Sequence, residues 1–541
     1  MHLGRIGTHT RDGRFPWRGA ALLLLAAALV FGAATLLRGT EYDENYSVFV
    51  TGGIARPAWP TTPFTATEVP APFHDHADLG TVTELIRRTD VHPPLYFWLL
   101  HGWRAVVGDG LPALRLLSVV CALGALLAWM RAAWLAGLPP LVTGALLALS
   151  YGFGLTGHVV RGYALAHLLV GLTVLAAVAA WRKPGLLRAG LAGLAGGLAC
   201  LTNYLAVFPV GVVLAWLVLT TPGWGRRLRV ALVAGVPCLA LLGMAGSVWL
   251  SQRASAVSQS AEQFDALPLL ATLARLAQYE AAILLGGLPL YVPAGLPRAA
   301  LGAALVLLLV AVALAMLWRW RGLGPLRWMW LAAALAPPLG LLVLGALFGT
   351  VPVELRYLVL GAPFFAVLGA ATVQAWYREA PRAAAWGLGL VLAVQAAGTL
   401  GMVLHPATQQ PFRAAVAALA PALRPPTLLL VPFGQDGVGI VGSLLRELPP
   451  DQPILVLRTA DAAAVPDRVA GACRLLLLGF GERDRASAAQ VAAAAAALAA
   501  APGWREDAVL WREERGGLAR LYLAGPGCMP GAGRDTGQER R

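Results

Sequence analysis

Charged residues are scarce in this chain of 541 residues. They make up 13% of the sequence, against roughly 25% in an average soluble domain, whereas apolar and aromatic residues make up 58%. Apolar runs of about twenty residues, each long enough to cross roughly 30 Å of hydrocarbon, recur between residues 20 and 404. This composition excludes a single soluble globule and predicts an α-helical polytopic membrane protein.

Lysine and cysteine are also scarce. Lys183 is the only lysine, so the formal net charge of +14 comes from arginine. The arginines stand in short clusters between the apolar runs, as topology signals do, and no basic stripe with interleaved aromatic residues indicates a nucleic-acid partner. The five cysteines show no CxxC pair and no Cys/His spacing typical of zinc. A DxD motif is missing too, which argues against an enzyme that binds a nucleotide sugar through a metal ion.

The apolar runs predict the topology. The run from Arg18 to Leu37 follows a basic segment and lacks a small-residue cleavage site, so we expect a retained first span after a cytoplasmic stretch of residues 1–18. Two short segments, 93–107 and 281–296, either cross the membrane as well or lie as juxtamembrane or re-entrant helices. The total is eleven or thirteen crossings, and both counts place the C-terminal part on the external or periplasmic side of the cell membrane. The ten further runs cover residues 112–136, 139–158, 163–181, 186–202, 204–221, 229–250, 299–318, 327–348, 357–377 and 384–404.

The composition changes after Leu404. We therefore expect a transmembrane domain at residues 19–404, with an external loop at 38–91, followed by a small external α/β domain at 405–525 and a disordered tail at 526–541. Three short apolar runs alternate with helical segments in the α/β domain, as buried parallel strands do. These runs cover residues 427–433, 453–458 and 474–480.

Glycines between residues 434 and 442 resemble a nucleotide-binding loop superficially. Their order matches neither GxGxxG nor a P-loop closely, and isolated glycine motifs are weak signals. We therefore expect no nucleotide site there.

The membrane part has few acidic residues, and most of them lie in one loop. Residues 1–404 hold 15 of the 28 acids, and eight of those fall in the loop after the first span. The acids from Glu68 to Asp90 are typical of a solvated loop. Asp43 and Glu44 differ, because they stand a few residues beyond the first span, where a carboxylate pair can reach a lipid headgroup. A reaction that needs a carboxylate at the outer face is expected to take it from this pair.

Two further segments place polar side chains near the expected membrane surface. His92 precedes Pro93 and Pro94, which can start a helix whose first backbone donors face an anion; Tyr96 equally suits an interfacial aromatic belt. Arg356 and Tyr357 follow a polar turn and open a span, so they can reach a lipid phosphate. The alternative is a snorkelling arginine beside a belt tyrosine.

At these positions the sequence resembles the GT-C glycosyltransferases of family 39, the group of protein O-mannosyltransferases and lipid A aminoarabinose transferases. The resemblance covers roughly residues 20 to 404. The motifs that carry it are YDENY at Tyr42 to Tyr46, HPPLYFWLLH at His92 to His101, GDGLPALRLLS at Gly108 to Ser118, RGYAL at Arg161 to Leu165, NYLA at Asn203 to Ala206 and LRYLVLGAP at Leu355 to Pro363.

The resemblance implies a GT-C fold and transfer of a sugar from a polyprenyl-phosphate donor to a lipid, glycan or protein acceptor at the outer membrane face. Inversion at the anomeric carbon is consistent with this chemistry. The resemblance places Asp43 at the reaction centre, with Glu44 beside it, and His92 near the lipid phosphate. Gly162 stands in a region where many family members carry a further acid. The residues predicted to bind the donor are His92, Tyr96, Arg161, Tyr163, Arg356 and Tyr357.

Other functions stay open. A polytopic transporter is the main alternative from another class, although the spans hold few ionisable residues for a substrate or proton pathway. A polymerase or ligase for lipid-linked glycans would share the donor chemistry, and a non-enzymatic surface-assembly subunit is a fourth reading. No cofactor is expected. His74 and His76, with Asp75 or Asp78, could ligate zinc or manganese, but short loops of this kind are more often solvated.

Overall fold

The structure is a computed structural model that describes residues 14–254, 268–348, 353–405, 411–423, 427–469, 471–480, 485–513 and 517–525. The predicted tail at 526–541 lies outside the described residues. The chain forms two compact units, which we call the membrane unit and the sheet unit. The membrane unit comprises the residues up to Leu37 and Leu79–Leu404; the sheet unit comprises Arg38–Asp78 and the residues from His405 onward. Residues 38–78 therefore group with the C-terminal sheet, whereas we expected them to belong to the transmembrane domain.

The membrane unit is helical throughout. Its helices run, in chain order, as α1 (Trp17–Leu37), α4 (Leu79–Thr89), α5 (Leu95–Val107), α6 (Leu111–Leu135), α7 (Pro140–Ala148), α8 (Tyr151–Thr156), α9 (Tyr163–Arg182), α10 (Leu186–Cys200), η2 (Tyr204–Ala206), α11 (Val207–Thr220), α12 (Trp224–Arg253), α14 (Leu269–Leu285), η4 (Leu288–Tyr291), α15 (Leu296–Trp318), η5 (Trp320–Gly322), α16 (Arg327–Phe348), α17 (Leu355–Leu358), η6 (Val359–Gly361), α18 (Ala362–Tyr377) and α19 (Pro381–Leu404).

Eight helices in the described part of the chain are long and apolar enough to cross a membrane. This confirms a multi-pass, mostly helical membrane protein. Helices α10 and α11 coincide with predicted spans but are shorter. The predicted run 139–158 is broken, because the Ser150 hydroxyl accepts a hydrogen bond from the Phe153 amide at 3.4 Å and so caps a new helix. The eight candidate spans are Trp17–Leu37, Leu111–Leu135, Tyr163–Arg182, Trp224–Arg253, Leu296–Trp318, Arg327–Leu347, Leu355–Tyr377 and Pro381–Leu404.

The two ambiguous segments adopt different structures. Residues 95–107 form the single helix α5, which begins directly after the Pro pair, as the sequence predicts. Residues 281–296 do not form one helix. Helix α14 ends at Leu285, and Gly286 follows with a φ of +117°, a conformation that favours glycine. The Gln395 side-chain amide donates to the Leu284 carbonyl at 2.6 Å, so the end of α14 lies against α19.

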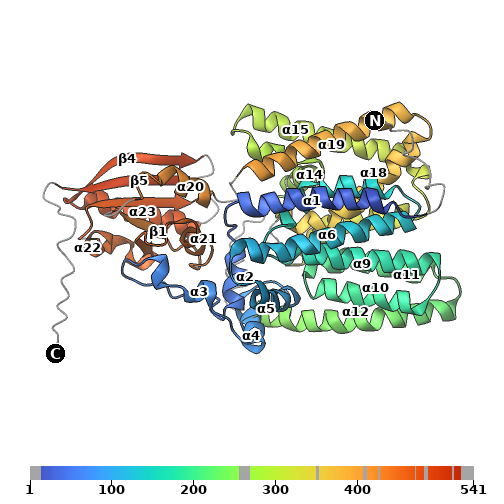
Figure 1. The fold of residues 1–541 in the computed structure, drawn as a ribbon, viewed down its shortest axis with the longest axis horizontal. Coiled ribbons are helices and arrows are strands. Elements are labelled where there is room, and N and C mark those ends of the chain that lie inside the picture. Colours follow the sequence, from blue (N-terminus) through green and yellow to red (C-terminus); the bar gives the residue numbers. More distant parts are fainter. Residues whose placement is uncertain are drawn as a thin grey trace. The chain divides into compact units, whose positions relative to one another are not determined.

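Helices α9, α10, α11 and α12 lie side by side within the membrane unit (Figure 1). Small residues permit this close packing. A Cβ atom at Gly193 of α10 would stand 1.9 Å from the Ala234 carbonyl oxygen of α12, so the two backbones are in contact. Close approach through small residues is typical of helix pairs in membranes, where apolar surface alone gives little driving force.

The sheet unit contains five strands in the order β2-β1-β3-β5-β4. Strand β1 pairs in parallel with β2 and β3, whereas β5 is antiparallel to both β3 and β4. This confirms the small C-terminal α/β unit that the alternating apolar runs predict. The elements are α20 (Phe412–Leu419), β1 (Thr427–Pro432), α21 (Gly439–Glu447), β2 (Ile454–Leu457), η7 (Thr459–Ala464), α22 (Val465–Arg468), β3 (Arg474–Phe480), α23 (Arg485–Ala500), β4 (Trp504–Glu513) and β5 (Gly517–Ala524).

Residues 38–78 contribute α2 (Glu44–Thr51), η1 (Ala66–Glu68) and α3 (Ala71–His74) to the sheet unit and pack against its C-terminal part. A Cβ atom at Gly439 would stand 2.1 Å from the Tyr42 ring, and the Asn45 amide donates to the Ser443 hydroxyl at 2.9 Å. The Trp59 indole donates to the Gly437 carbonyl at 2.6 Å. Gly439 and Gly442 thus serve the packing of α2 and its flanking loop, whereas Gly434 and Gly437 adopt positive φ angles. These local demands explain why the spacing of the glycines matches no nucleotide motif.

Candidate active site

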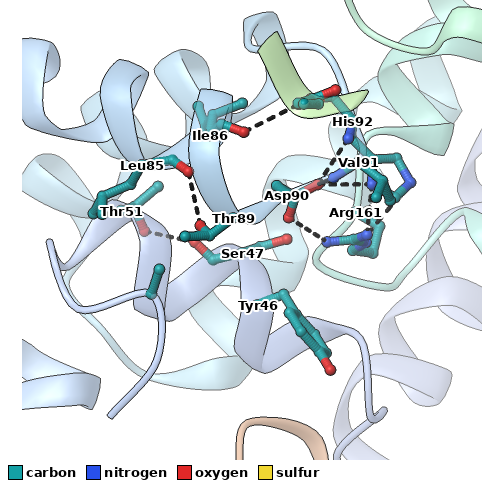
Figure 2. Close-up of polar contacts among 12 residues, drawn as sticks. Tyr46, Ser47, Thr51, Leu85, Ile86, Thr89, Asp90, Val91, His92 and Arg161 are labelled. Carbon is teal, nitrogen blue, oxygen red and sulfur yellow. Dashed lines mark hydrogen bonds and ion pairs between the residues drawn. The ribbon is translucent and has the colours of Figure 1, made fainter. Parts of the chain in front are cut away.

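A buried polar cluster stands where α4 ends and α5 begins. Asp90 and His92 lie in the short segment between these helices, and Arg161 lies in the turn between α8 and α9. Figure 2 shows the side chains of His92 and Arg161 converging on Asp90. Asp90 is 4% exposed and Arg161 is 6% exposed. The chain therefore brings together two of the predicted donor-binding residues and a carboxylate that the sequence analysis treated as solvated.

Asp90 organises the cluster. One carboxylate oxygen, Oδ1, accepts hydrogen bonds from the backbone amides of Val91 and His92 at 2.7 and 2.8 Å, and it lies 2.9 Å from Nδ1 of His92. The other oxygen, Oδ2, lies 3.9 Å from the Arg161 guanidinium. The interpretation of Asp90 as a solvated loop residue is wrong, because its carboxylate is buried and has partners on both oxygens. It folds the segment into a fixed turn.

The electrostatics of the cluster fix the charge on each group. Burial alone would raise the pKa of Asp90, but the hydrogen bond from His92 and the positive charge of Arg161 outweigh it, so the pKa of Asp90 lies well below its usual value. Burial lowers the pKa of His92 and the charge of Arg161 lowers it further, against the opposing effect of Asp90. The carboxylate is thus ionised and the imidazole is neutral near pH 7.

A neutral imidazole has one donor and one acceptor, and both are used here. Nδ1 lies 2.9 Å from Oδ1 of Asp90, and Nη2 of Arg161 lies 2.9 Å from Nδ1 and 3.3 Å from Nε2. With Nδ1 donating to Asp90, Nε2 is the acceptor that is left for the guanidinium. His92 therefore links a carboxylate to a guanidinium instead of adding positive charge of its own. The cation that can face a phosphate in this cluster is Arg161.

Two predicted tyrosines surround the cluster. Tyr163, the first residue of α9, is 4% exposed, and its ring meets His92 edge to face with centroids 6.4 Å apart. Its hydroxyl has no hydrogen-bond partner among the residues that the structure describes. Tyr96 on α5 is 2% exposed, so it lies in the protein interior and not in an interfacial belt.

Close packing around residue 162 explains why glycine stands there. A Cβ atom there would approach the Tyr96 Cβ at 3.2 Å and the Thr202 carbonyl oxygen at 3.3 Å. A larger side chain at 162 would push α5 away from the start of α9. The chain thus keeps glycine at the position where the resemblance leads one to look for a further acid.

The predicted pair Arg356 and Tyr357 lies on the short helix α17 of the same unit. The Arg356 guanidinium lies 5.6 Å from the centre of the Tyr357 ring. Tyr357 packs against a buried apolar cluster that also contains Tyr163 and Leu358. The structure thereby connects Tyr357 to the surroundings of His92 through Tyr163.

Asp43 and Glu44 belong to the sheet unit. Asp43 precedes the first residue of α2 and is partly exposed, and its side chain makes no cap hydrogen bond to that helix in the described structure. Glu44 is fully buried, and its carboxylate accepts from the Glu41 amide at 2.9 Å. The two acids therefore differ in environment: Glu44 holds its own turn together, whereas Asp43 stands at the surface of the turn.

We also searched the described residues for side chains that could bind a metal ion. Among them, no group of three or more His, Cys, Asp or Glu side chains is arranged to hold a metal ion.

Comparison with known proteins gives matches at the level of structure. No family model and no curated protein matches the sequence. ArnT from Cupriavidus metallidurans in the apo state is 15% identical, and the superposition covers 94% of this chain and 99% of that chain with a TM-score of 0.50. The chain has the GT-C fold. ArnT bound to undecaprenyl phosphate aligns at 14% identity over the same 94% and 99%, with a TM-score of 0.49. The arabinofuranosyltransferase AftD from Mycobacteria aligns at 14% identity over 95% of this chain and 40% of that chain, with a TM-score of 0.47.

The match to apo ArnT confirms the GT-C fold that the motifs imply. It spans almost the whole of both chains, so the sheet unit is included in the likeness as well as the helices. At 15% identity the likeness concerns the fold alone, and the roles of individual residues remain predictions.

Within this GT-C fold, sequence reasoning missed Gln252. This residue lies near the end of α12, and its side-chain amide donates to the His92 carbonyl at 2.9 Å and to the Ile86 carbonyl at 3.1 Å. Its side-chain oxygen accepts from the Tyr204 hydroxyl at 2.9 Å. Gln252 thus holds the Asp90–His92 turn against α12. A buried glutamine near the end of an apolar span was the available signal, since such residues need internal partners.

Proposed function

We propose that this protein is a membrane glycosyltransferase that moves a sugar from a polyprenyl-phosphate donor to a lipid, glycan or protein acceptor. The observation that carries the proposal is the likeness in fold to ArnT over nearly the full length of both chains. ArnT has also been solved with undecaprenyl phosphate, which is the kind of lipid that we propose here. The buried Asp90–His92–Arg161 cluster supports the same function, because it holds a guanidinium next to the predicted donor-binding tyrosines.

We propose that the reaction proceeds with inversion. An acceptor hydroxyl or amine attacks the anomeric carbon, and the bond from that carbon to the phosphate oxygen breaks. The electron pair leaves with polyprenyl phosphate, and Asp43 takes the proton of the acceptor. Glu44 is a weaker candidate for this base, because its carboxylate already accepts a backbone hydrogen bond. A positioned carboxylate of this kind contributes roughly a hundredfold to ten-thousandfold in rate.

The leaving phosphate needs donors and positive charge. We assign that task to Arg161 and Arg356, with the phenols of Tyr96 and Tyr357 as further donors; Tyr163 is assigned to the same donor site. His92 acts through Arg161, because its imidazole is neutral and accepts from the guanidinium. A guanidinium suits this role, since its planar donors match phosphate geometry.

We further propose that transfer takes place at the outer face of the cell membrane and uses no resident metal ion. The absence of a DxD motif from the sequence supports the second point. A chelator assay tests it: turnover of the purified protein in excess EDTA should equal turnover with added Mg²⁺ or Mn²⁺. A loss of turnover in EDTA that manganese restores would contradict metal-free transfer.

Mass spectrometry of glycolipids and glycoproteins from cells with and without the gene tests the function. The proposal predicts that one species loses the mass of a single monosaccharide when the gene is absent, and that purified protein transfers that sugar from its undecaprenyl phosphate. A glycan polymerase or ligase would instead move an oligosaccharide, and a transporter would show no transfer at all. Either of those outcomes would overturn the proposal.

A further inference from the structure

Glu280 is a buried acid that the proposed chemistry does not use. It lies on α14, which is not one of the eight candidate spans, and it is 9% exposed. Neither of its carboxyl oxygens has a hydrogen-bond partner among the residues that the structure describes. Asp90, in contrast, is buried with partners on both oxygens.

The position of Glu280 on α14 shows which way it faces. Leu276 and Ile283 lie four residues before and three residues after it, so the three residues share one side of the helix. Both Leu276 and Ile283 are buried in an apolar cluster with Tyr163 and Val359. Glu280 therefore faces the interior of the membrane unit, where α14 packs against α8 and α17.

An unpaired carboxyl group in such surroundings is costly. Burying a polar group without a hydrogen bond destabilises the folded protein, and folded proteins leave few such groups unsatisfied. The phenol of Tyr163 belongs to the same cluster, and its hydroxyl also lacks a partner in the described structure. Two unsatisfied polar groups that border one cluster indicate that a polar ligand supplies their partners.

The chemistry of the two groups limits what that ligand is. A carboxylate accepts hydrogen bonds and repels anions, so Glu280 is not suited to the donor phosphate, for which Arg161 is available. A sugar hydroxyl can donate to the carboxylate of Glu280 and can also accept from the phenol of Tyr163. A lipid tail offers neither interaction.

We propose that Glu280 is a sugar-contacting residue, which together with Tyr163 binds hydroxyl groups of the sugar that the polyprenyl phosphate carries. This inference rests on the proposed function, because it assigns a part of the same donor site. A site built to hydrogen-bond a sugar hydroxyl rejects a ligand that lacks it, because the buried groups then stay unpaired. Glu280 and Tyr163 accordingly set the preference for glycosylated donor over bare polyprenyl phosphate.

The test compares bare and glycosylated lipids with four proteins in detergent. The lipids are undecaprenyl phosphate and a panel of undecaprenyl phosphates that carry glucose, mannose or arabinose. The proteins are the wild type, Glu280→Met, Tyr163→Phe and the control Glu379→Gln. Glu379 is an exposed acid that pairs with Arg319. Its substitution therefore removes a carboxylate without changing the apolar cluster around Tyr163.

We expect Glu280→Met to weaken binding of the preferred glycosylated lipid at least tenfold while affinity for bare undecaprenyl phosphate stays within twofold. Tyr163→Phe should also lower the ratio of the affinity for the glycosylated lipid to the affinity for the bare lipid. This second variant keeps the inference testable if Glu280→Met does not fold. The thermal midpoint of ligand-free Glu280→Met should equal or exceed that of the wild type, because methionine removes an unsatisfied polar group.

The inference is overturned if both variants distinguish the glycosylated lipid from the bare lipid as well as the wild type does. A different result would contradict the proposed function itself. If the wild type binds none of these lipids and transfers no sugar, then the donor assignment and the role of Glu280 both fall. If the wild type transfers sugar and the variants match it, only the role of Glu280 falls.

Discussion

Nδ1 of His92 lies 2.9 Å from Oδ1 of Asp90, and the same oxygen accepts the backbone amide of His92 at 2.8 Å. The acid therefore fixes both the main chain and the ring of the histidine. The Arg161 guanidinium lies against the same ring, 2.9 Å from Nδ1 and 3.3 Å from Nε2. Asp90 and His92 are therefore positioning residues for Arg161.

Asp90→Asn should destabilise the protein, because the side chain loses the negative charge that faces the buried Arg161. We expect a loss of about 1–3 kcal/mol in the free energy of unfolding, together with weaker binding of undecaprenyl phosphate. The thermal midpoint in detergent measures the first effect. Glu84→Gln is the control, because Glu84 forms an exposed ion pair with Arg88 on α4 and such pairs contribute little. Equal midpoints for the two variants would contradict the structural role of Asp90.

The stability of the cluster should depend on pH. The pKa of His92 is lowered by burial and by Arg161, so the unfolded chain binds a proton at His92 where the folded chain does not. The contribution of His92 to the free energy of unfolding is therefore fully present above the pKa of the unfolded chain, about 6.5. It is lost as the pH falls below that value. The pKa of Asp90 is also lowered, so its contribution is lost at still lower pH, beginning near its unfolded value.

Thermal unfolding between pH 8 and pH 5 measures this dependence. The variant His92→Gln can keep both hydrogen bonds without titrating, so its midpoint should fall less than that of the wild type below pH 6.5. The other histidines contribute equally to both proteins and cancel in the difference. Parallel curves for the two proteins would show that His92 is not held neutral.

Gln252→Met should loosen the turn that carries His92. The change removes the donors to the carbonyls of His92 and Ile86 and the acceptor for Tyr204. We expect faster amide exchange at residues 90–92 and a several-fold loss of donor affinity. Gln374→Met serves as the control, because Gln374 donates to the Gly137 carbonyl at 3.3 Å on other elements of the unit. Unchanged exchange in Gln252→Met would mean that the turn holds without α12.

The apolar runs of the sequence predict that the sheet unit is external, since we expect eleven or thirteen crossings after a cytoplasmic start. A reporter that is active only in the cytoplasm, fused after Gly525, should be silent, and one that is active only outside should give signal. Strong cytoplasmic activity would overturn the assignment of the two sides.

The fold follows from the sequence where local patterns dominate. Long apolar runs predict most of the spans, and the Pro pair at 93 and 94 predicts the start of α5, because proline is favoured where a helix begins. The break at Ser150 escaped prediction. A single hydroxyl that caps a new helix leaves no mark on average hydropathy.

Contacts between distant residues account for the rest. The burial of Asp90 depends on Arg161, which stands far along the chain, so a loop acid looks solvated in the sequence. The packing of Tyr42 against Gly439 joins segments nearly four hundred residues apart, and this contact explains the glycine at the start of α21. Glu280 is likewise unremarkable in sequence, and its importance comes from the burial of a carboxylate without partners.

Transfer of sugar by Asp43→Asn is the most direct measurement of the central claim. The substitution keeps the size of the side chain and most of its hydrogen bonding, so insertion and donor binding should survive. The account predicts a loss of roughly a hundredfold to ten-thousandfold in turnover, with a smaller loss for Glu44→Gln, whose carboxylate stabilises its own turn. Each purified variant is assayed with a defined undecaprenyl-phosphate sugar, beside a measurement of donor binding. Wild-type turnover by Asp43→Asn would contradict the claim that Asp43 is the base: a loss only in Glu44→Gln would transfer the role to Glu44, and full activity in both would refute the mechanism.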